Sequence, residues 1–348
     1  MHPIMKKYFF LILTAIIALS LAFLCLSNLE LDLFTGMISG NDKLSNINDY
    51  IIDEGNIQIF FCPRENCETA FVKFLDSAET SIHCALFDVG LDSVQKKLLE
   101  KAEQESLEVQ IVTDDQYLKK FDYPFVKADS GGLMHNKFCI IDGKKISTGS
   151  MNPTDNCANK NNNNLLLIDS NLLTQNYERE FQEMWNGQFK KGEPVTTPKL
   201  LLGSILVQNY FCPEDHCAYR VEEELKKAEK SIYFMTFSFT NEGIANVLLL
   251  KNLDGIFIQG VMEARQISEY SQFERLLNNN INVIKDMNKN NMHHKVFIVD
   301  EETIITGSFN PTGGGDTSND ENILIIKDKE IANRYLKEFE LLRMEAQG

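Results

Sequence analysis

Apolar and polar positions alternate along this chain in a pattern that predicts strands and helices in the same order twice. Short apolar runs predict strands, and apolar residues spaced by three and four predict helices. In the first half the expected elements are strands at 57–63, 81–87, 107–113 and 165–168, helices at 68–79, 91–103 and 172–185, and a hairpin at 135–148. Strands that alternate with helices and then form a hairpin indicate a mixed α/β sheet with helices on its faces.

The second half repeats this plan. The string FCPEDHC at residue 211 aligns with FCPRENC at residue 61, an offset of 150, and the hairpin recurs at an offset of 158. We therefore place a gain of eight residues within 240–292. A strand at 323–326 and a helix at 331–344 close the second copy. The sequence predicts an α/β fold of two similar halves, each a mixed β-sheet flanked by helices.

The most informative repeated stretch reads HNKFCIIDGKKISTGSMN from residue 135 and HHKVFIVDEETIITGSFN from residue 293. Six positions match: His135/His293, Lys137/Lys295, Asp142/Asp300, Gly149/Gly307, Ser150/Ser308 and Asn152/Asn310. Side chains at i and i+2 of a strand share one face, so each His projects together with its Lys. Asp142 and Gly143 make a good hairpin turn, and residues 300–302 make a weaker one. The returning strand would bring the Ser and Asn back beside the His and Lys.

These residue types suit the cleavage of a phosphodiester. Attack on phosphorus builds negative charge on the non-bridging oxygens, and two Lys and two Asn are suitable preorganised donors for that charge. Two imidazoles, which titrate near neutral pH, provide a nucleophile and a general acid. One motif supplies half of this set, which explains why the chain carries two. The donors serve without a metal ion, so we expect no metal and no cofactor.

At this spacing the two stretches resemble the paired HKD motifs of the phospholipase D superfamily, and the likeness extends over about residues 57–345. The resemblance implies two halves around a pseudo-twofold axis that share one active site within a single chain, so no homodimer is needed. It implies metal-independent hydrolysis, or transfer to an alcohol, through a phosphohistidine. The catalytic residues that it implies are His135, Lys137, Asp142, Ser150, Asn152, His293, Lys295, Asp300, Ser308, Asn310 and Glu321. Four of them are expected to bind the phosphate: Lys137, Asn152, Lys295 and Asn310.

Asn163 and Glu321 each follow a motif His by 28 residues. By resemblance, these two groups orient the histidines across the interface, Glu321 on His135 and Asn163 on His293. A carboxylate raises the basicity of an imidazole and an amide does not, which would make His135 the nucleophile and His293 the acid. The alternative is that both are loop residues that cap a strand. His294 is a rival of His293, but it lies outside the HxK register and would point to the other face.

Four of the eight cysteines form a repeated C-P-x-x-x-C pattern, Cys62 with Cys67 and Cys212 with Cys217. We expect two short local disulfides outside the cytoplasm. Zinc binding is the alternative, although this spacing is looser than the usual CxxC and has no fixed His partner. Three further cysteines are expected to be buried small hydrophobes: Cys84, Cys139 and Cys157.

Residues 8–26 contain no charge and follow Lys6 and Lys7. This pattern predicts a signal-anchor transmembrane helix within 1–27 that attaches the protein to the membrane and holds the catalytic body outside the cytoplasm. A cleaved signal peptide with a secreted body is the alternative. The other predicted parts are a spacer at 28–56, a first phospholipase D-like repeat at 57–187, a linker at 188–203 and a second repeat at 204–346.

The substrate is not read directly by the motifs, because they recognise the phosphodiester and not the groups that flank it. The net charge of −16 argues against avid non-specific nucleic-acid binding. Together with the expected membrane anchor, it favours a phospholipid headgroup ester. Strings such as IYFMTFSFT resemble the superfamily's small nucleases, so an endonuclease that acts on DNA or RNA outside the cytoplasm is the alternative. An inactive binding module is a remote third possibility.

Overall fold

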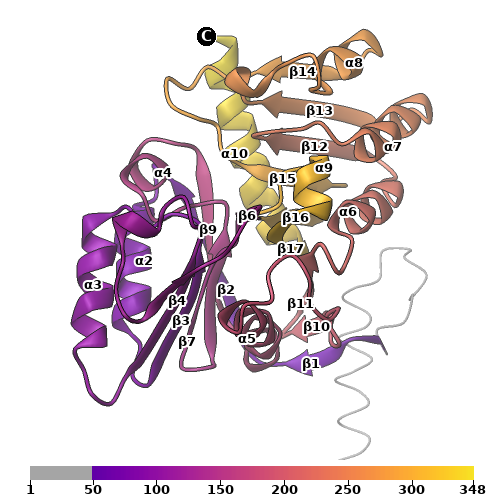
Figure 1. The fold of residues 1–348 in the computed structure, drawn as a ribbon. Coiled ribbons are helices and arrows are strands. Elements are labelled where there is room, and N and C mark those ends of the chain that lie inside the picture. Colours follow the sequence, from indigo (N-terminus) through magenta and orange to yellow (C-terminus); the bar gives the residue numbers. More distant parts are fainter. Residues whose placement is uncertain (1–48) are drawn as a thin grey trace, which may run out of the picture. The chain divides into compact units, whose positions relative to one another are not determined.

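The computed structural model describes residues 49–348, which fold into two mixed β-sheets flanked by helices (Figure 1). The predicted membrane helix within 1–27 and most of the predicted spacer at 28–56 lie outside the described residues. Within 49–348, no helix combines the length and the apolar character needed to cross a membrane.

The first sheet has the strand order β2-β9-β8-β7-β3-β4-β5. Its strands are β2 (Asn56–Cys62), β3 (Ser81–Leu86), β4 (Glu108–Thr113), β5 (Val126–Ala128), β7 (Lys137–Ile141), β8 (Lys145–Gly149) and β9 (Asn163–Asp169). The accompanying helices are α2 (Cys67–Asp76), α3 (Asp92–Ala102), the short η2 (Leu118–Lys120), α4 (Asp155–Asn159) and α5 (Asn171–Trp185). Each predicted strand and helix of this half is present, with ends that differ by a few residues.

The second sheet repeats this order as β11-β17-β16-β15-β12-β13-β14. Its strands are β11 (Ile205–Cys212), β12 (Ser231–Thr236), β13 (Phe257–Met262), β14 (Asn282–Lys285), β15 (Lys295–Val299), β16 (Thr303–Gly307) and β17 (Asn319–Lys327). Its helices are α6 (Cys217–Lys226), α7 (Glu242–Leu253), the short η3 (Ala264–Gln266), α8 (Phe273–Asn278), α9 (Gly313–Thr317) and α10 (Lys329–Gln347). The extra residues of this half follow β13 and include α8, inside the range where the sequence offsets place a gain.

Three additional strands extend the second sheet. β10 (Lys199–Leu202) pairs with β11, and β1 (Ile51–Asp53) pairs with β10. These two strands lie within the predicted linker and the predicted spacer, so both of those segments contain more structure than expected. The third strand, β6 (Leu133–Met134), comes from the first half and pairs with β17 of the second. Strands of two to four residues are too short to show a clear alternation of apolar and polar positions.

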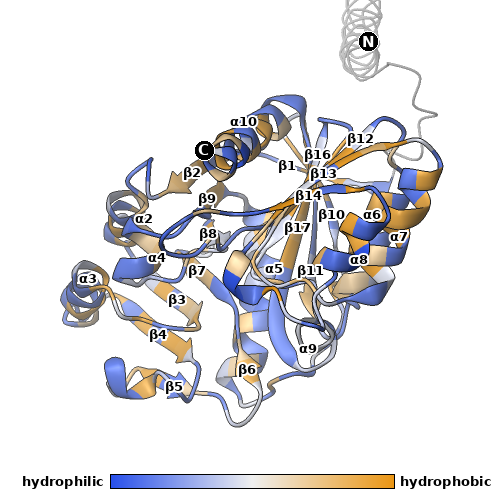
Figure 2. Ribbon diagram, turned by 90° about the horizontal axis from the view of Figure 1, so that it is seen from above, coloured by the Kyte–Doolittle hydropathy of each residue, from blue (hydrophilic) through white to orange (hydrophobic). Residues whose placement is uncertain are grey.

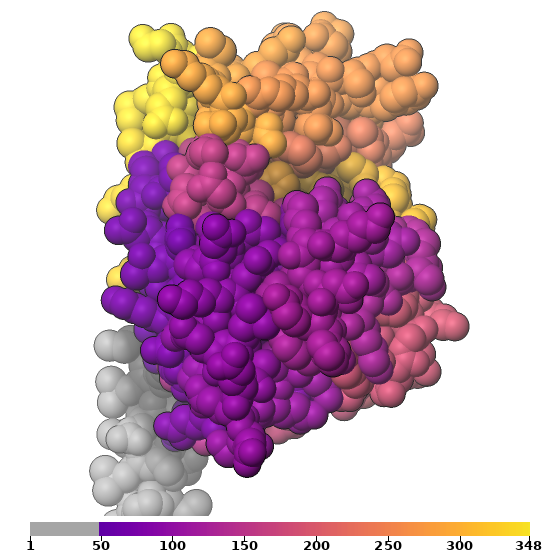
Figure 3. Space-filling model, turned by 60° about the vertical axis from the view of Figure 1, so that its left-hand side comes forward, coloured from indigo at the N-terminus to yellow at the C-terminus, as the bar shows by residue number. Residues whose placement is uncertain are grey.

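The apolar core has three parts. One lies between the first sheet and helices α2 and α3, and another between the second sheet and helices α6, α7 and α8. The third joins the two halves, and it buries Phe138 of β7, Tyr177 and Phe181 of α5, and Tyr335 and Phe339 of α10. Burial of each such aromatic side chain stabilises the folded state by about 1.5–3 kcal/mol. Figure 2 shows apolar residues on the strands and on helices such as α7, and Figure 3 shows the two halves in direct contact on one face.

Both motif hairpins turn through two residues with positive φ, Asp142 (55°) and Gly143 (60°) in one and Asp300 (54°) and Glu301 (58°) in the other. Two consecutive positive φ angles define the tight turn that fits the twist of paired strands. Each return strand ends at a glycine, and a Cβ on Gly149 would lie 2.5 Å from the Asn164 carbonyl oxygen. Gly149 and Gly307, each just before a motif Ser, therefore allow β8 to lie close to β9 and β16 to lie close to β17.

Candidate active site

The two motif histidines are held by backbone bonds that cross between the halves. The His135 amide donates to the Asp320 carbonyl at 3.0 Å, next to the pairing of β6 with β17. The His293 amide donates to the Asn162 carbonyl at 2.8 Å, next to a bridge between Asn162 and Met292. Each half therefore fixes the start of the other half's motif, and the two motifs meet at the interface.

The motif lysines lie beside their histidines, as the i, i+2 spacing implies. Lys137 Nζ donates to the His135 carbonyl at 2.6 Å. Lys295 Nζ donates to the His293 carbonyl at 2.9 Å and lies 3.3 Å from His293 Nε2. The charge of each lysine acts on both imidazoles, and all four side chains are buried, so His135, Lys137, His293 and Lys295 form one buried cluster, hereafter the pocket. Two cationic donors beside two imidazoles form a site suited to a phosphodiester anion.

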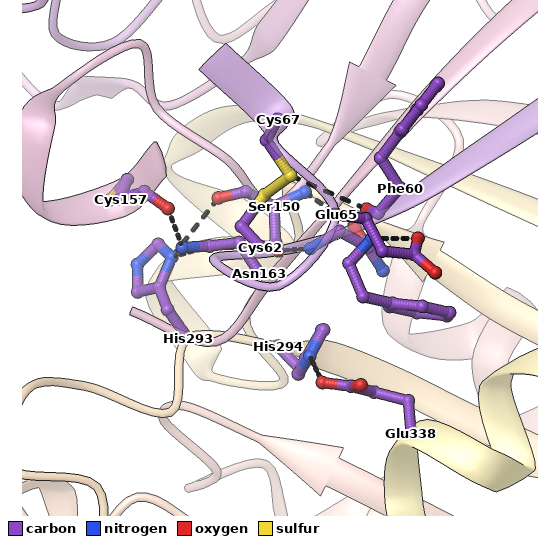
Figure 4. The surroundings of a disulfide bond; sticks show 12 residues. Phe60, Cys62, Glu65, Cys67, Ser150, Cys157, Asn163, His293, His294 and Glu338 are labelled. Carbon is purple, nitrogen blue, oxygen red and sulfur yellow. Dashed lines mark hydrogen bonds and ion pairs between the residues drawn. A yellow bond between two sulfur atoms is a disulfide. The ribbon is translucent and has the colours of Figure 1, made fainter. Parts of the chain in front are cut away.

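The two imidazoles have different partners across the interface. Nδ1 of His135 lies 2.8 Å from both carboxylate oxygens of Glu321. Nδ1 of His293 lies 2.8 Å from the Asn163 amide oxygen and 3.2 Å from the Ser150 carbonyl (Figure 4). Nδ1 of His293 faces two acceptor oxygens, so Nδ1–H donates; beside an ionised Glu321, Nδ1–H of His135 donates as well, and Nε2 of each ring is left without a proton. This is the crossed arrangement that the sequence resemblance implies, with a carboxylate on one histidine and an amide on the other.

Burial determines the electrostatics of this pocket. Burial lowers the pKa of His135 and of His293 well below the usual range, and the nearby lysine charges lower both further. Burial raises the pKa of Glu321 to about 8, against the effect of the Lys137 charge. His135 and Glu321 share a proton and titrate as one pair. The pair carries one negative charge when His135 Nε2 is free to attack, and the two lysine charges stabilise that form.

The motif serines and asparagines have separate roles. Ser150 Oγ donates to Asn163 Oδ1 at 3.0 Å, and Ser308 Oγ accepts from the Asn322 amide at 2.9 Å, so the serines support the strands that hold the histidines. Asn152 and Asn310 are different, because among residues 49–348 their buried amide oxygens have no hydrogen-bond partner. An amide oxygen can only accept, so these two atoms are available to a donor group, whereas Asn152 Nδ2 already donates to Cys157 Sγ at 3.7 Å.

Asp142 and Asp300 do not reach the pocket. Asp142 accepts from the backbone amides of Glu79, Thr80 and Ser81, and Asp300 accepts from those of Glu229, Lys230 and Ser231. Each Asp stands after the end of its motif strand, five residues beyond the Lys, which corresponds to roughly 16 Å along a strand. The structure therefore gives these two motif residues a structural position at the hairpin turn.

Two aromatic residues belong to the site although the sequence reasoning missed them. The rings of Phe87 and His135 lie 4.9 Å apart, and those of Phe237 and His293 lie 4.6 Å apart, both edge to face. Lys137 Nζ lies 5.0 Å from the Phe87 ring, and Lys295 Nζ lies 5.1 Å from the Phe237 ring. The two rings limit the rotation of the imidazoles, and their π-electrons stabilise the charged form of the nearby lysines. The sequence carried one signal for them: Phe87 and Phe237 are 150 residues apart, the same offset that separates the FCP strings of the two halves.

His294 lies outside the pocket. Its Nε2 is 3.2 Å from the carboxylate of Glu338, and Figure 4 shows it directed away from His293. Neighbouring residues of an extended segment point to opposite sides, so the choice of His293 over His294 agrees with the geometry. His294 is a buried structural residue.

The repeated cysteine pairs form disulfides, Cys62–Cys67 and Cys212–Cys217, so the zinc alternative does not describe them. The expectation of buried free thiols was wrong for Cys84 and Cys139, which form a third disulfide between β3 and β7. It holds for Cys157, which is buried and free. Three disulfides are typical of proteins outside the cytoplasm. Within 49–348, the carboxylate groups that could hold a metal ion include none of the motif residues.

We expect the alkaline limb of kcat/KM to follow the loss of charge on the two motif lysines. Burial lowers the pKa of Lys137 to about 8 and lowers the pKa of Lys295 well below its usual range, where the Lys137 charge lowers it further. Only a charged lysine attracts a phosphodiester, so kcat/KM should fall as rising pH removes both charges and should be low above about pH 8. A bound anion raises the pKa of each lysine, so the limb for kcat should lie at higher pH. Full pH profiles of wild type and Lys137→Met measure both limbs, and an unchanged kcat/KM limb in the variant would contradict the assignment.

Comparison with known proteins identifies the family. The family model described as "Cardiolipin synthase, PLD-like domain" matches the chain twice, over residues 71–185 and 221–343. A phospholipase D of Rickettsia conorii (strain ATCC VR-613 / Malish 7) is 31% identical over 132 residues, which cover 38% of this chain and 66% of the relative. A mitochondrial cardiolipin hydrolase of Xenopus laevis is 27% identical over 137 residues, which cover 36% of this chain and 65% of the relative. The chain thus spans slightly less than two thirds of these relatives.

One solved structure supports the two-half fold. The phosphatidylserine synthase of Haemophilus influenzae Rd KW20 is 12% identical, with a TM-score of 0.64, and the match covers 83% of this chain and 86% of that protein. At this identity the likeness concerns the fold alone. The family model matches more than half of the chain and recurs in both halves, so this protein belongs to the phospholipase D-like family, with two PLD-like regions in one chain.

Proposed function

We propose that this protein is a phospholipase D-type phosphodiesterase that cleaves phospholipid headgroup esters through a phosphohistidine. The observation that carries the proposal is the pair of crossed contacts in one buried pocket, Glu321 on His135 and Asn163 on His293. Both lysines lie in the same pocket, so the anion, the nucleophile and the acid are brought together.

In the first step His135 Nε2 attacks phosphorus, an N–P bond forms, and the P–O bond to the leaving group breaks. Glu321 stabilises the positive charge that the imidazole gains. His293 donates its proton to the leaving oxygen. The bound phosphodiester anion raises the pKa of His293, which burial lowers in the free protein, so the histidine gains its proton together with the substrate. The partner of His293 is the neutral amide of Asn163. A neutral partner does not stabilise the charged imidazole as a carboxylate would, so His293 gives up its proton more easily.

In the second step water attacks the same phosphorus, and His293 accepts its proton. The N–P bond breaks and the phosphomonoester leaves, so His135 is restored. An alcohol in place of water gives transfer in place of hydrolysis. Lys137, Lys295 and the side-chain amides of Asn152 and Asn310 donate to the non-bridging oxygens in both steps.

The phospholipid substrate rests on supporting observations outside the pocket. The relatives in Rickettsia and Xenopus carry the names phospholipase D and mitochondrial cardiolipin hydrolase. The three disulfides are typical of a body outside the cytoplasm, and the predicted anchor at 1–27 would hold that body at a membrane surface. The net charge of −16 is unfavourable for binding the phosphates of nucleic acids.

The substrate is tested by assaying the full chain in parallel on phosphatidylcholine, cardiolipin and single-stranded DNA. We expect headgroup release from a phospholipid and an activity on DNA that is lower by at least about tenfold in kcat/KM. Cleavage of DNA alone would contradict the phospholipid substrate and leave the phosphodiesterase chemistry in place. Inactivity on all three, in a folded sample with oxidised cysteines, would contradict both.

The activity should survive EDTA. Lys137, Lys295, Asn152 and Asn310 provide the positive charge and the donors that a metal ion would otherwise supply. We therefore expect less than a twofold change in kcat on dialysis against a chelator. Loss of activity that added zinc or magnesium restores would contradict this mechanism.

A further inference from the structure

The two repeated disulfides stand next to the two residues that hold the motif histidines. Across β2 and β9, Cys62 pairs with Asn163, and across β11 and β17, Cys212 pairs with Glu321. The four cysteines of these disulfides are fully buried. The C-P-x-x-x-C pattern therefore recurs at the one position of each sheet that lies beside a histidine-holding residue.

Each of these disulfides fixes the end of a strand. Cys62 is the last residue of β2 and Cys67 is the first residue of α2, with a Cα–Cα distance of 5.5 Å. Hydrogen bonds reinforce the loop, since the Glu65 amide donates to the Phe61 carbonyl and the Phe61 amide donates to the Glu65 carboxylate, both at 2.8 Å. The strand end opposite Asn163 is thus closed into a short covalent loop (Figure 4).

The second half has the same construction. Cys212 ends β11 and Cys217 begins α6, with a Cα–Cα distance of 5.6 Å. The Asp215 amide donates to the Phe211 carbonyl at 2.9 Å, and the Phe211 amide donates to the Asp215 carboxylate at 3.0 Å. The strand end opposite Glu321 is therefore closed in the same way.

From each loop a short path of contacts leads to a histidine. Asn163 accepts from Ser150 Oγ, donates to the Cys157 carbonyl at 2.9 Å, and holds His293 Nδ1 at 2.8 Å. Its amide has little freedom to turn, so the position of β9 sets the position of the imidazole. Glu321 holds His135 at 2.8 Å from β17 in the same manner. Catalytic geometry tolerates errors of only about 0.5 Å, so a small shift of either strand end would be felt at the histidine.

We propose that each repeated disulfide positions one catalytic histidine: Cys62–Cys67 acts through Asn163 on His293, and Cys212–Cys217 acts through Glu321 on His135. The roles of the two histidines are those of the proposed function, on which this inference rests. Loss of the first disulfide should then weaken protonation of the leaving group, and loss of the second should weaken the nucleophile. The two losses have different kinetic signatures.

The third disulfide provides a matched control. Cys84 and Cys139 are register partners on β3 and β7, and neither faces Asn163 or Glu321 across a strand pair. This bond closes a loop of 55 residues, whereas the repeated bonds each close one of five. In the chain-entropy account a longer loop contributes more stability. Its removal should therefore cost stability without changing how the rate depends on the leaving group.

The test compares three paired variants, Cys62→Ala/Cys67→Ala, Cys212→Ala/Cys217→Ala and Cys84→Ala/Cys139→Ala. Each is assayed on an alkyl phosphodiester and on its p-nitrophenyl analogue, whose leaving group needs little protonation. The readouts are the two first-step rates, measured as pre-steady-state release of the leaving group per folded protein, and their ratio; kcat is not used because the later hydrolysis step also uses His293 and is common to both esters. We expect the first variant to lose about tenfold on the alkyl ester and less than threefold on the p-nitrophenyl ester, so its ratio changes. The second should lose about tenfold on both, which leaves the ratio unchanged but lowers both rates, and the third should keep both wild-type rates.

The same assay on Asn163→Ala and Glu321→Gln tests the proposed roles of the two histidines independently of the disulfides. If these two variants show the expected contrast, while Cys62→Ala/Cys67→Ala keeps the wild-type ratio and Cys212→Ala/Cys217→Ala keeps the wild-type rate on both esters, disulfide positioning is overturned and the proposed function stands. If Asn163→Ala and Glu321→Gln show no contrast, the proposed roles of the two histidines are overturned, and with them the basis of this inference. Equal ratio changes in all three cysteine variants would overturn positioning in favour of a general effect on stability.

A second measurement covers a variant that does not fold. Wild-type protein is treated with increasing dithiothreitol, which reduces each disulfide to two thiols and is itself oxidised. Mass spectrometry of alkylated peptides records which pair has opened at each stage. The ratio of the two first-step rates should change when the 62–67 pair opens and should not change when only the 84–139 pair opens. An unchanged ratio after the 62–67 pair has fully opened overturns the proposal.

Discussion

His135→Ala should abolish turnover of every phosphodiester, by at least about 10⁴-fold in kcat. This histidine is the proposed nucleophile, and without it no covalent intermediate forms, however good the leaving group is. The loss should therefore be equal on an alkyl ester and on a p-nitrophenyl ester. Steady-state kinetics on both substrates measure it.

His293→Ala should behave differently on the same two substrates. The alkyl ester needs a proton on its leaving oxygen, so its kcat should fall by about 10²–10⁴-fold. The p-nitrophenyl ester needs little protonation, so its first step should survive, and a burst of p-nitrophenol should precede slow hydrolysis. His294→Asn is the matched control, because the equivalent position of the first half is Asn136 and His294 contacts Glu338 outside the pocket. A burst from His135→Ala, or none from His293→Ala, would contradict the assigned roles.

Glu321→Gln should lower kcat by about 10²–10⁴-fold, the cost found when a histidine loses its orienting carboxylate. The variant keeps the shape of the side chain and removes its charge, so the positive charge on the attacking imidazole of His135 loses its partner. Both ester substrates should lose equally, because the defect lies in the nucleophile. Circular dichroism and thermal unfolding show whether the fold is intact.

Asn163→Asp is the reciprocal change and should be milder. A carboxylate beside His293 raises the pKa of that imidazole, which makes it a weaker acid. The expected result is a loss of about tenfold or less on the alkyl ester and nearly none on the p-nitrophenyl ester. Equal losses for Asn163→Asp and Glu321→Gln on both esters would contradict the unequal partners on which the mechanism depends.

Much of this site follows from the sequence because the chain repeats itself. The i, i+2 spacing places each His with its Lys, and the hairpin glycines allow the return strand to approach. The spacing of 28 residues between a motif His and Asn163 or Glu321 marks both orienting residues. The crossing of those residues to the other half came from family resemblance, because spacing within one half does not reveal which half supplies the partner.

Other features of the site and of the fold could not be predicted from the sequence alone. Asp142 was assigned to the site as part of the motif, although its carboxylate binds backbone amides at the far end of β7. Cys84 and Cys139 are 55 residues apart, and their bond depends on the pairing of β3 with β7. The second half has Phe234 and Phe297 at these positions, so the repeat carried no signal for it. Phe87 and Phe237 were read as strand residues because aromatic side chains are common in strands.

The most direct test of the central claim is to locate the covalent intermediate. A substrate labelled in the retained phosphoryl group is mixed with the His293→Ala variant, which should form the intermediate and hydrolyse it slowly. The reaction is quenched without acid, because phosphohistidine is acid-labile, and the peptides are mapped by mass spectrometry. The account predicts the phosphoryl group on His135. A label on another residue of the His293→Ala variant, or on His293 of the wild-type protein, would contradict it.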